Sequence, residues 1–333
     1  MSEIEARHPR AEADALLPAG HSARVLEPSP PANTDPDWYA DDPTDPDDGE
    51  ETVVTPIAAE GVLWDDIIDT HPELAPYASE HWLGAHHRLE ALPAGFEVTR
   101  NALHQVAFFA TAPKRYSATG KLGLRYTYRG FGTPFFGDDE QVRVEGTALV
   151  HQQGDQVSVV SVTGLAEACE FLGIPYREEW FEDFHDPLAP VGPRTPLDID
   201  PDAVQAIGDW FGFATLVLER ARRTPGAADV SRVQIWPEHF DSAVEMGSQA
   251  RGHRASYGAS PGDEDHPGPY LYVAAWGDID RNDPFWDDDF FNGASLSYAE
   301  LLDSEDQIAT ALDFFTRGYE RLTISSQTPS IDA

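Results

Sequence analysis

The chain has 333 residues, enough for one large or two ordinary domains, and its hydrophobic content of 41% is sufficient for a sizeable core. Acidic residues outnumber basic ones by 59 to 22, which gives a formal net charge of −37. A field this negative argues against nucleic acid and against anionic membranes as partners.

The cysteine count and the hydropathy pattern favour a soluble cytoplasmic protein. Cys169 is the only cysteine, so the chain cannot form an internal disulfide. The first thirty residues are broken by charges and prolines and lack the apolar core of a secretory signal. No run of about eighteen apolar residues occurs, so no membrane span is expected.

The N-terminal segment, residues 1–56, is predicted to be disordered. It holds nine prolines and fourteen acidic residues against three arginines. Such a segment cannot bury enough apolar surface to offset the entropy lost on ordering. We interpret it as a solubilising acidic Pro-rich tail, with docking to a basic protein partner as the alternative. Residues 323–333 are predicted to fray.

The folded part is predicted to span residues 57–322, either as one domain or as two packed halves, 57–175 and 200–322. Its first clear helix is expected to begin at the N-cap Asn101 and to end before Lys114 and Arg115, where a helix dipole favours cations.

Three further helices are predicted. Residues 165–172 form a short one, stopped by Gly173. The best-marked helix begins at Asp200 and Pro201 and carries apolar residues at a spacing of three and four. The last helix is capped near Ser304 and continues to about residue 322.

Strands are predicted between these helices. Residues 121–129 alternate apolar and polar side chains, which is typical of a half-buried strand. A glycine-marked loop, 130–137, leads into a predicted hairpin of 142–150 and 157–162. Further strands are expected at 232–236, 254–258 and 270–276, the last one central because it is apolar on both faces. This order favours an α+β fold with mostly antiparallel sheet and packed helices.

An island of basic residues is the first candidate site. Residues 98–137 contain no Asp or Glu, although acids are abundant elsewhere, and both lysines of the protein lie there. Positive potential inside a negative protein concentrates anions, and arginine binds phosphate or carboxylate bidentately. We expect a small anionic or polar ligand at the basic strand and its glycine-rich loop, or else neutralisation by the protein's own acids. The candidate ligand-binding residues are Lys114, Arg115, Lys121, Arg125 and Arg129.

A histidine and carboxylate group is the second candidate site. His239 and Asp241 are two residues apart, and Asp263 and Glu264 follow in a glycine-bounded turn. Imidazole with carboxylates suits a divalent transition metal or a general acid/base pair. His239, Asp241 and Glu264 are therefore candidate catalytic residues, and His239, Asp241 and Asp263 are candidate metal ligands. The alternative is a turn in which the acids cap backbone amides.

Several familiar motifs are absent from the sequence. The glycine loop lacks the Gly-Lys-Ser/Thr ending of a P-loop, and no Gly-x-Ser-x-Gly serine elbow occurs. Cys169 lies among apolar residues and is interpreted as a core residue. No motif identifies a cofactor, and the enzyme class, if any, stays open.

Four blocks carry a resemblance to a known family. They are Leu103-His104, Trp236-x-x-x-Phe240-Asp241, Pro267-x-Pro269-Tyr270-x-Tyr272 and an aromatic residue at Tyr319. Over residues 101–322 the chain resembles a bacterial family known only as a domain of unknown function. It departs from that family in the acidic 278–289 loop and in the acidic N-terminal extension. The resemblance implies no catalytic residues, but it implies that residues 57–322 form one evolutionary unit.

Three functions therefore follow from the sequence as hypotheses. The first is binding of a small anionic or polar ligand at the basic strand. The second is a metal-assisted enzyme that uses the His, Asp and Glu group. The third is an acidic protein–protein interaction module that binds a basic partner.

Overall fold

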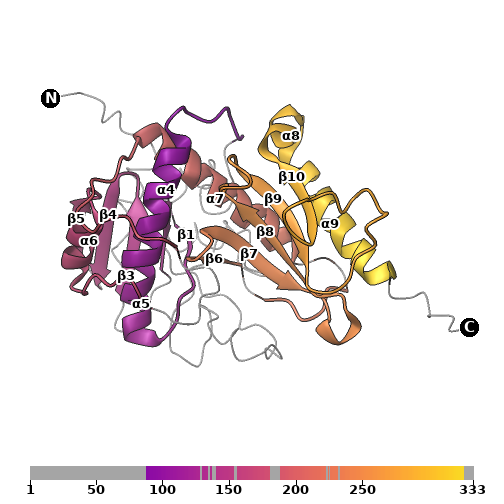
Figure 1. The fold of residues 1–333 in the computed structure, drawn as a ribbon, viewed down its shortest axis with the longest axis horizontal. Coiled ribbons are helices and arrows are strands. Elements are labelled where there is room, and N and C mark those ends of the chain that lie inside the picture. Colours follow the sequence, from indigo (N-terminus) through magenta and orange to yellow (C-terminus); the bar gives the residue numbers. More distant parts are fainter. Residues whose placement is uncertain are drawn as a thin grey trace, which may run out of the picture.

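The computed structural model describes residues 88–127, 130–133, 136, 140–153, 156–180, 188–222, 224, 226–231 and 233–325. The expectations for the acidic tail 1–56, for residues 57–87 of the predicted folded part, for Arg129, for residues 134, 135 and 137 of the glycine-marked loop and for residues 326–333 lie outside this range. The described residues form helices and two antiparallel sheets, which confirms the α+β class (Figure 1). None of the described helices is long and apolar enough to cross a membrane.

The strands form two five-stranded sheets, β1 to β5 from the first part of the chain and β6 to β10 from the second. The helices are α4 (Phe96–Val106), the π-helical turn η4 (Ala107–Thr111), α5 (Ala112–Thr119), α6 (Leu165–Leu172), α7 (Pro201–Ala221), α8 (Tyr298–Asp303) and α9 (Gln307–Ser325), with a 3-10 turn η5 (Gln249–Arg251). The first sheet contains β1 (Arg125–Thr127), β2 (Gly130–Gly132), β3 (Glu140–Glu145), β4 (Ala148–Gln153) and β5 (Gln156–Ser161). The second sheet contains β6 (Gln234–Trp236), β7 (Asp241–Met246), β8 (Ala255–Ser260), β9 (Tyr270–Ala275) and β10 (Gly293–Ser297).

The first helix begins earlier and runs further than predicted. Gly95 is its N-cap, whereas Asn101 is exposed in the middle of α4. The helix continues without a break through η4 into α5, because the buried apolar stripe continues through 107–112. Lys114 and Arg115 therefore lie within α5 and not beyond the end of the helix.

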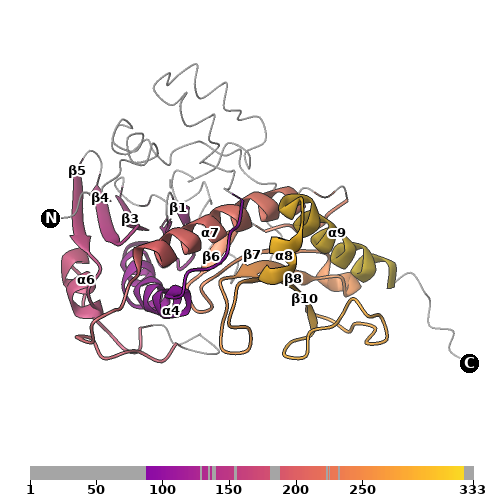
Figure 2. The same ribbon diagram turned by 90° about the horizontal axis from the view of Figure 1, so that it is seen from above.

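The other predicted helices are confirmed. The side chain of Asp200 caps α7 by accepting hydrogen bonds from the backbone N–H groups of Asp202 and Ala203. This helix is nearly all buried from Ala203 to Leu218, so it is a core helix with little solvated face. Figure 2 shows α7 running lengthwise through the molecule, from the first sheet to the second.

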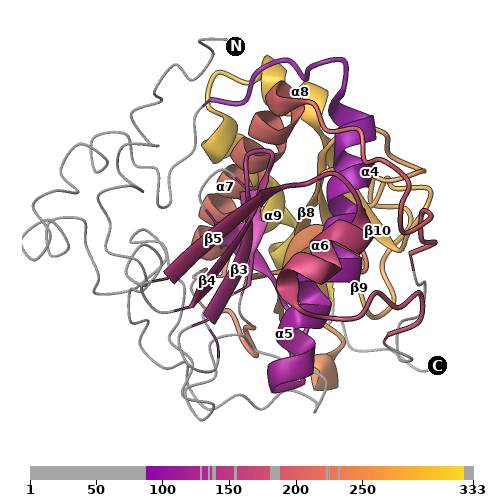
Figure 3. The same ribbon diagram turned by 90° about the vertical axis from the view of Figure 1, so that its left-hand side faces the viewer.

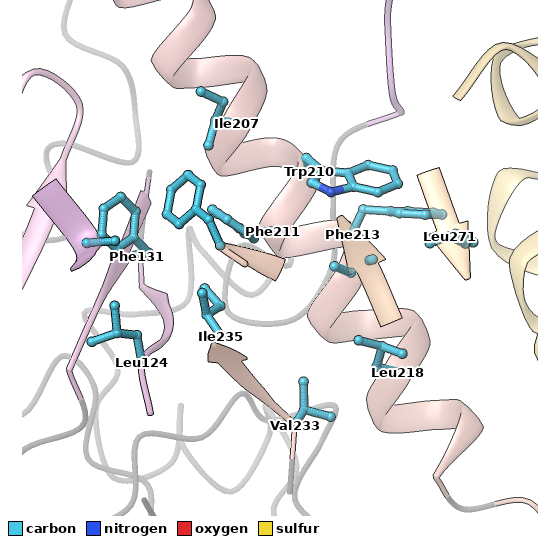
Figure 4. Packing of buried hydrophobic residues seen from close by; sticks show 14 of the residues in the cluster. Leu124, Phe131, Ile207, Trp210, Phe211, Phe213, Leu218, Val233, Ile235 and Leu271 are labelled. Atoms are coloured by element: carbon cyan, nitrogen blue, oxygen red, sulfur yellow. The ribbon is translucent and has the colours of Figure 1, made fainter. Parts of the chain in front are cut away.

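Each sheet is a meander, and the two sheets meet edge to edge. Their strand orders are β1-β2-β3-β4-β5 and β10-β9-β8-β7-β6. One antiparallel bridge joins β1 to β6: Leu124 N–H donates to Ile235 O at 2.8 Å and Ile235 N–H donates to Leu124 O at 2.6 Å. Next to this bridge, the ring of Phe131 on β2 contacts Phe211 of α7 at 6.3 Å between centroids (Figure 4).

The observed strands differ from the predicted ones in the first sheet. Residues 130–132, predicted as loop, form β2, and the predicted strand 142–150 is two strands, because Gly146 at φ +58° turns the chain between β3 and β4. Figure 3 shows β3, β4 and β5 side by side, with α6 and α4 next to them.

The second sheet also contains strands that the sequence did not reveal. Strand β7 is buried along its whole length and therefore shows no alternation of polar and apolar residues. Strand β10 was also missed. Strand β9, predicted to be central, is second from the edge, and β8 is the central strand.

Successive side chains of each strand point to opposite sides, so the joined sheets have two faces. The helix face carries apolar residues such as Leu124, Ile235 and Tyr257, and Tyr257 contacts Phe315 of α9 at 6.1 Å between ring centroids. We call the opposite side the outer face. Residues directly opposite each other in neighbouring strands share a face, so the register extends one outer-face row across both sheets. This row contains Arg143, Gly132, Arg125, Gln234, Ala243, Gly258 and Tyr272.

Gly258 allows Tyr272 to lie across the central strand. A Cβ atom at Gly258 would overlap the phenol ring of Tyr272, which crosses β8 at this point. The hydroxyl of Tyr272 thereby reaches β7, where it donates a hydrogen bond to Asp241 Oδ2. The side chain of Tyr272 therefore links β9 to β7, and it can do so because residue 258 is a glycine.

We expect Gly258→Ala to lower the free energy of unfolding by about 1–3 kcal/mol, because the ring of Tyr272 must move. Urea unfolding measures the effect. Gly268→Ala is the matched control, since its Cβ would meet no atom within 4 Å. In a Tyr272→Ala background the alanine at 258 should cost much less, and an equal cost in both backgrounds would contradict this explanation.

Candidate functional site

The predicted basic strand is buried on both faces. Lys121 is 7% exposed and Arg125 is 6% exposed, so the expectation of one solvated basic face is wrong. Lys114 forms an ion pair with Glu140 at 2.8 Å, and Arg115, fully buried, donates to the carbonyl of Gly123 at 2.9 Å. Lys114 and Arg115 thus hold α5 against neighbouring segments.

A cavity lies where β1 and β6 separate beyond their single bridge. The residues that line it are Arg125, Tyr126, Thr215, Val233, Gln234, Ile235 and Ser242. They come from β1, β6, β7 and α7 and the segment before β6, so both halves of the chain form its wall. The volume open to the centre of a water molecule is about 10 Å³, room for about one water. We call it the junction cavity.

The wall of the junction cavity contains polar atoms with unused hydrogen-bonding capacity. Gln234 Oε1 and Ser242 Oγ are buried and have no hydrogen-bond partner among the described residues. A buried polar group without a partner costs about 1–3 kcal/mol, so such atoms mark places where water or a ligand group binds. Arg125, a cationic residue, also lines this cavity.

A second arginine lies in the same outer-face row as Arg125. Arg125 is opposite Gly132, and Gly132 is opposite Arg143, so a glycine separates the two arginines. Arg143 Nη1 donates to Gln152 Oε1 at 3.0 Å and to Gln141 Oε1 at 3.2 Å. These bonds hold the Arg143 side chain on the outer face.

The turn between β6 and β7 is strained and is held by His104. Phe240 has φ +55°, a left-handed conformation that is rare for a bulky residue. His104 of α4 stacks on the Phe240 ring at 5.3 Å, and its Nε2 lies 3.0 Å from the carbonyl oxygens of both Pro237 and Glu238. Burial lowers the pKa of His104 to about 4. The imidazole is therefore neutral at pH 7, with Nε2 as the protonated nitrogen.

Asp241 follows this turn and is the most deeply buried acid of the second candidate site. Its Oδ2 accepts from Tyr272, whereas Oδ1 is buried without a hydrogen-bond partner in the described part of the chain. Burial, more than any neighbouring charge, raises the pKa of Asp241. Burial and the adjacent Asp241 carboxylate raise the pKa of Tyr272 well above its usual value.

Hydrogen bonds also connect the 261–268 loop to β9 and to the 278–289 loop. Tyr270 donates to Asp263 Oδ2 at 2.7 Å, and Asp263 Oδ1 accepts from the backbone N–H groups of Asp265 and His266. His266 Nε2 contacts Asp288 Oδ2 at 3.0 Å. The expected turn, in which Asp263 caps backbone amides, is therefore present.

The candidate catalytic and metal-binding residues occupy different environments. The side chain of His239 is 56% exposed and lies 3.3 Å from Glu238, Glu264 is exposed, and Asp241 is buried. Within the described residues, no three His, Cys, Asp or Glu side chains are grouped so as to hold a metal ion. Cys169 is buried, and burial raises the pKa of its thiol to about 11, in keeping with a core residue.

Sequence reasoning missed several residues of these sites. Gln234, Ser242 and Arg143 lie in strands whose pairing brings them to the cavity and to the outer face, and no local pattern distinguishes them. Tyr272 carried a signal only as part of a block on which the predicted family resemblance rests. His104 belongs to another such block.

Comparisons with known proteins add no family or relative. No protein-family model matches the chain, and no match was found among curated proteins or solved structures. The resemblance described above therefore stays a prediction.

The neutral state of His104 makes stability depend on pH. Its pKa is about 4 in the folded protein and about 6.5 when unfolded, so the folded state resists protonation and stability is lost as pH falls through this window. We expect the wild type to lose about 2 kcal/mol more than His104→Gln between pH 7 and pH 5. Urea unfolding of both proteins at the two pH values measures this difference. Equal losses would show that His104 is not the responsible group.

Proposed function

We propose that the protein binds a small anionic or polar ligand at the junction cavity, with Arg125 as the cationic contact. The observation that carries the proposal is the lining of this cavity: Arg125 lines it together with Gln234 and Ser242, whose Oε1 and Oγ atoms are buried and lack partners within the described residues. An enclosed site with few polar groups and a positive charge is typical of small-molecule recognition.

The location supports the proposal independently of the side chains. The cavity lies between two sheets that share one bridge, and ligand sites occur preferentially at such boundaries between structural units. A ligand larger than water requires β1 and β6 to move apart. Among the described residues, the two backbone hydrogen bonds between Leu124 and Ile235 join these strands, so the movement breaks little regular structure.

The ligand class follows from charge. Arg125 offers a rigid fork of N–H donors that matches a carboxylate or phosphate. The cavity is enclosed, so the attraction is screened less by solvent than at the surface. The net charge of −37 opposes the approach of highly charged anions, which favours ligands with a single negative group.

A thermal-shift screen tests this function. The probes are inorganic phosphate, acetate, succinate and short amino and hydroxy acids, at matched ionic strength. Ligand at 100 times its Kd should stabilise the protein by about 2.7 kcal/mol, which raises Tm by several degrees. Absence of a shift with every probe would overturn the proposal.

Ser242→Ala is the diagnostic variant for the cavity. It removes a buried hydroxyl that has no partner in the described structure, so the free energy of unfolding should not fall and should rise by up to about 1–3 kcal/mol. Its affinity for the active probe should fall about tenfold, because the ligand loses one hydrogen bond. The matched control is Ser158→Ala on the exposed strand β5, which should leave both quantities unchanged.

A further inference from the structure

We propose that two copies of this chain associate through strand β5, whose free edges pair antiparallel about a two-fold axis at Ser158. The pairing would join the sheets of both copies into one continuous sheet. This interface lies apart from the junction cavity, because β5 is the far strand of the first sheet and β1 is the strand that lines the cavity. The inference therefore does not depend on the proposed function.

Strand β5 is the open end of the joined sheets. In the described part of the chain it pairs with β4 alone, and the ribbon views show it at one end of the molecule (Figure 1, Figure 3). At the opposite end, β10 is shorter and leads directly into α8 after Ser297. The Gly293 carbonyl of β10 also accepts a hydrogen bond from Asp288 N–H at 3.3 Å. Pairing of like edges therefore favours β5.

Strand β5 lacks the features that protect an edge strand from pairing. Natural proteins place charged side chains, prolines or bulges at exposed edges. The sequence of β5 is Gln-Val-Ser-Val-Val-Ser, which carries no charge and no proline. It also pairs with β4 residue for residue, without a bulge. An edge of this kind is a template for a second strand.

The backbone groups on the free edge belong to the odd-numbered residues of β5. Val162 N–H donates to Thr147 O at 3.0 Å, so these two opposite residues form a hydrogen-bonded pair. Hydrogen-bonded and non-hydrogen-bonded pairs alternate along an antiparallel ladder. The even-numbered residues of β5 therefore bond to β4, whereas the N–H and C=O groups of Val157, Val159 and Ser161 point to the free edge.

The same odd-numbered residues carry exposed apolar side chains. Val157 is 46% exposed and Val159 is 61% exposed. Val159 is opposite Val150, which is opposite Arg143, so both exposed valines lie on the outer face. Two exposed valines on one face of an edge strand form an apolar surface that a partner strand can cover.

The directions of the backbone groups restrict the register of a symmetric pair. Residues that point outward must lie opposite residues that also point outward, so the two-fold axis passes at a residue and not between two residues. An axis at Ser158 places Val157 opposite Val159 of the second copy, and the reverse. Each of these two pairs exchanges two backbone hydrogen bonds, and the four valines form one row. An axis at Val159 instead places Val157 opposite Ser161, which favours the axis at Ser158.

Charge also favours contact at this end of the molecule. The net charge of −37 opposes the approach of two copies, so contact requires a region without acids. Residues 156–166 contain no Asp or Glu, and neither does the neighbouring strand β4. The acidic 278–289 loop connects β9 to β10 in the second sheet. An isologous contact at β5 therefore keeps the acidic loops of the two copies apart.

Sedimentation velocity of the full-length protein over a wide concentration range tests the association. A single strand pair is smaller than a standard stable interface, so we expect a weak, concentration-dependent monomer–dimer equilibrium. Association should strengthen as NaCl is raised, because salt screens the repulsion between like charges. Val159→Lys should weaken association at least tenfold. The matched control is Val98→Lys on α4, where the valine is 53% exposed, and it should behave like the wild type.

Val159→Pro tests the backbone pairing. Proline removes the N–H of residue 159, which points to the free edge, and leaves the hydrogen bonds between β4 and β5 in place. We expect at least tenfold weaker association, while urea unfolding shows that the variant is folded. Association equal to that of the wild type in this folded variant would contradict pairing through the edge of β5.

Ser158→Cys tests the register. Across the two-fold axis the two Cα atoms would be about 4.5 Å apart, a separation that a disulfide spans. Copper phenanthroline, which oxidises two thiols to a disulfide, should therefore give a covalent dimer on a non-reducing gel. Gln156→Cys is the matched control, because its two copies would be four residues apart along the strands, about 13 Å, and should not cross-link. Cys169 is buried in both variants.

The outcomes decide the proposal without reference to the ligand screen. A wild type that stays monomeric at every concentration, or an association that weakens as NaCl is raised, overturns it. A dimer that Val159→Lys and Val159→Pro leave intact overturns it as well, because the interface then lies elsewhere. Cross-linking of Gln156→Cys without cross-linking of Ser158→Cys overturns the register about Ser158.

Discussion

The pairing of Leu124 with Ile235 is the contact on which the architecture depends. It joins two five-stranded meanders at the edges of β1 and β6, with two backbone hydrogen bonds in the described part of the chain. Two hydrogen bonds contribute about 1–3 kcal/mol net, so they cannot hold two sheets together alone. Packing of helix α7 holds the two sheets together as well, because α7 packs on strands of both sheets and is buried on nearly all sides.

The weakness of this pairing creates the candidate site. If β1 and β6 were paired along their full length, backbone hydrogen bonds would close the space between them. Because they separate after one pair, side chains from both sheets line a cavity at the boundary. The basic strand predicted from the sequence thus contributes Arg125 to an enclosed site instead of an exposed basic face.

Strand β7 carries side chains on both faces of the second sheet. Its successive residues point to opposite faces, so Asp241 lies on the outer face while Ser242 points toward α7 and lines the cavity. The strained turn before β7 positions both residues, and His104 holds that turn through two backbone carbonyls. Local strain of this kind is kept only where surrounding packing over-determines it, and it gathers at functional sites.

The sequence alone determined the helices with strong caps, such as α7 behind Asp200, and the α+β class, because capping and periodicity are local properties. The sequence also pointed to Arg125, because this residue lies in the segment 98–137, which contains no Asp or Glu. Tertiary structure decided that this residue is buried, that Arg143 lies across Gly132 from it, and that Gln234 lies at its side. Strand register determines these neighbours, and register depends on residues far apart in the chain, so no local pattern encodes it.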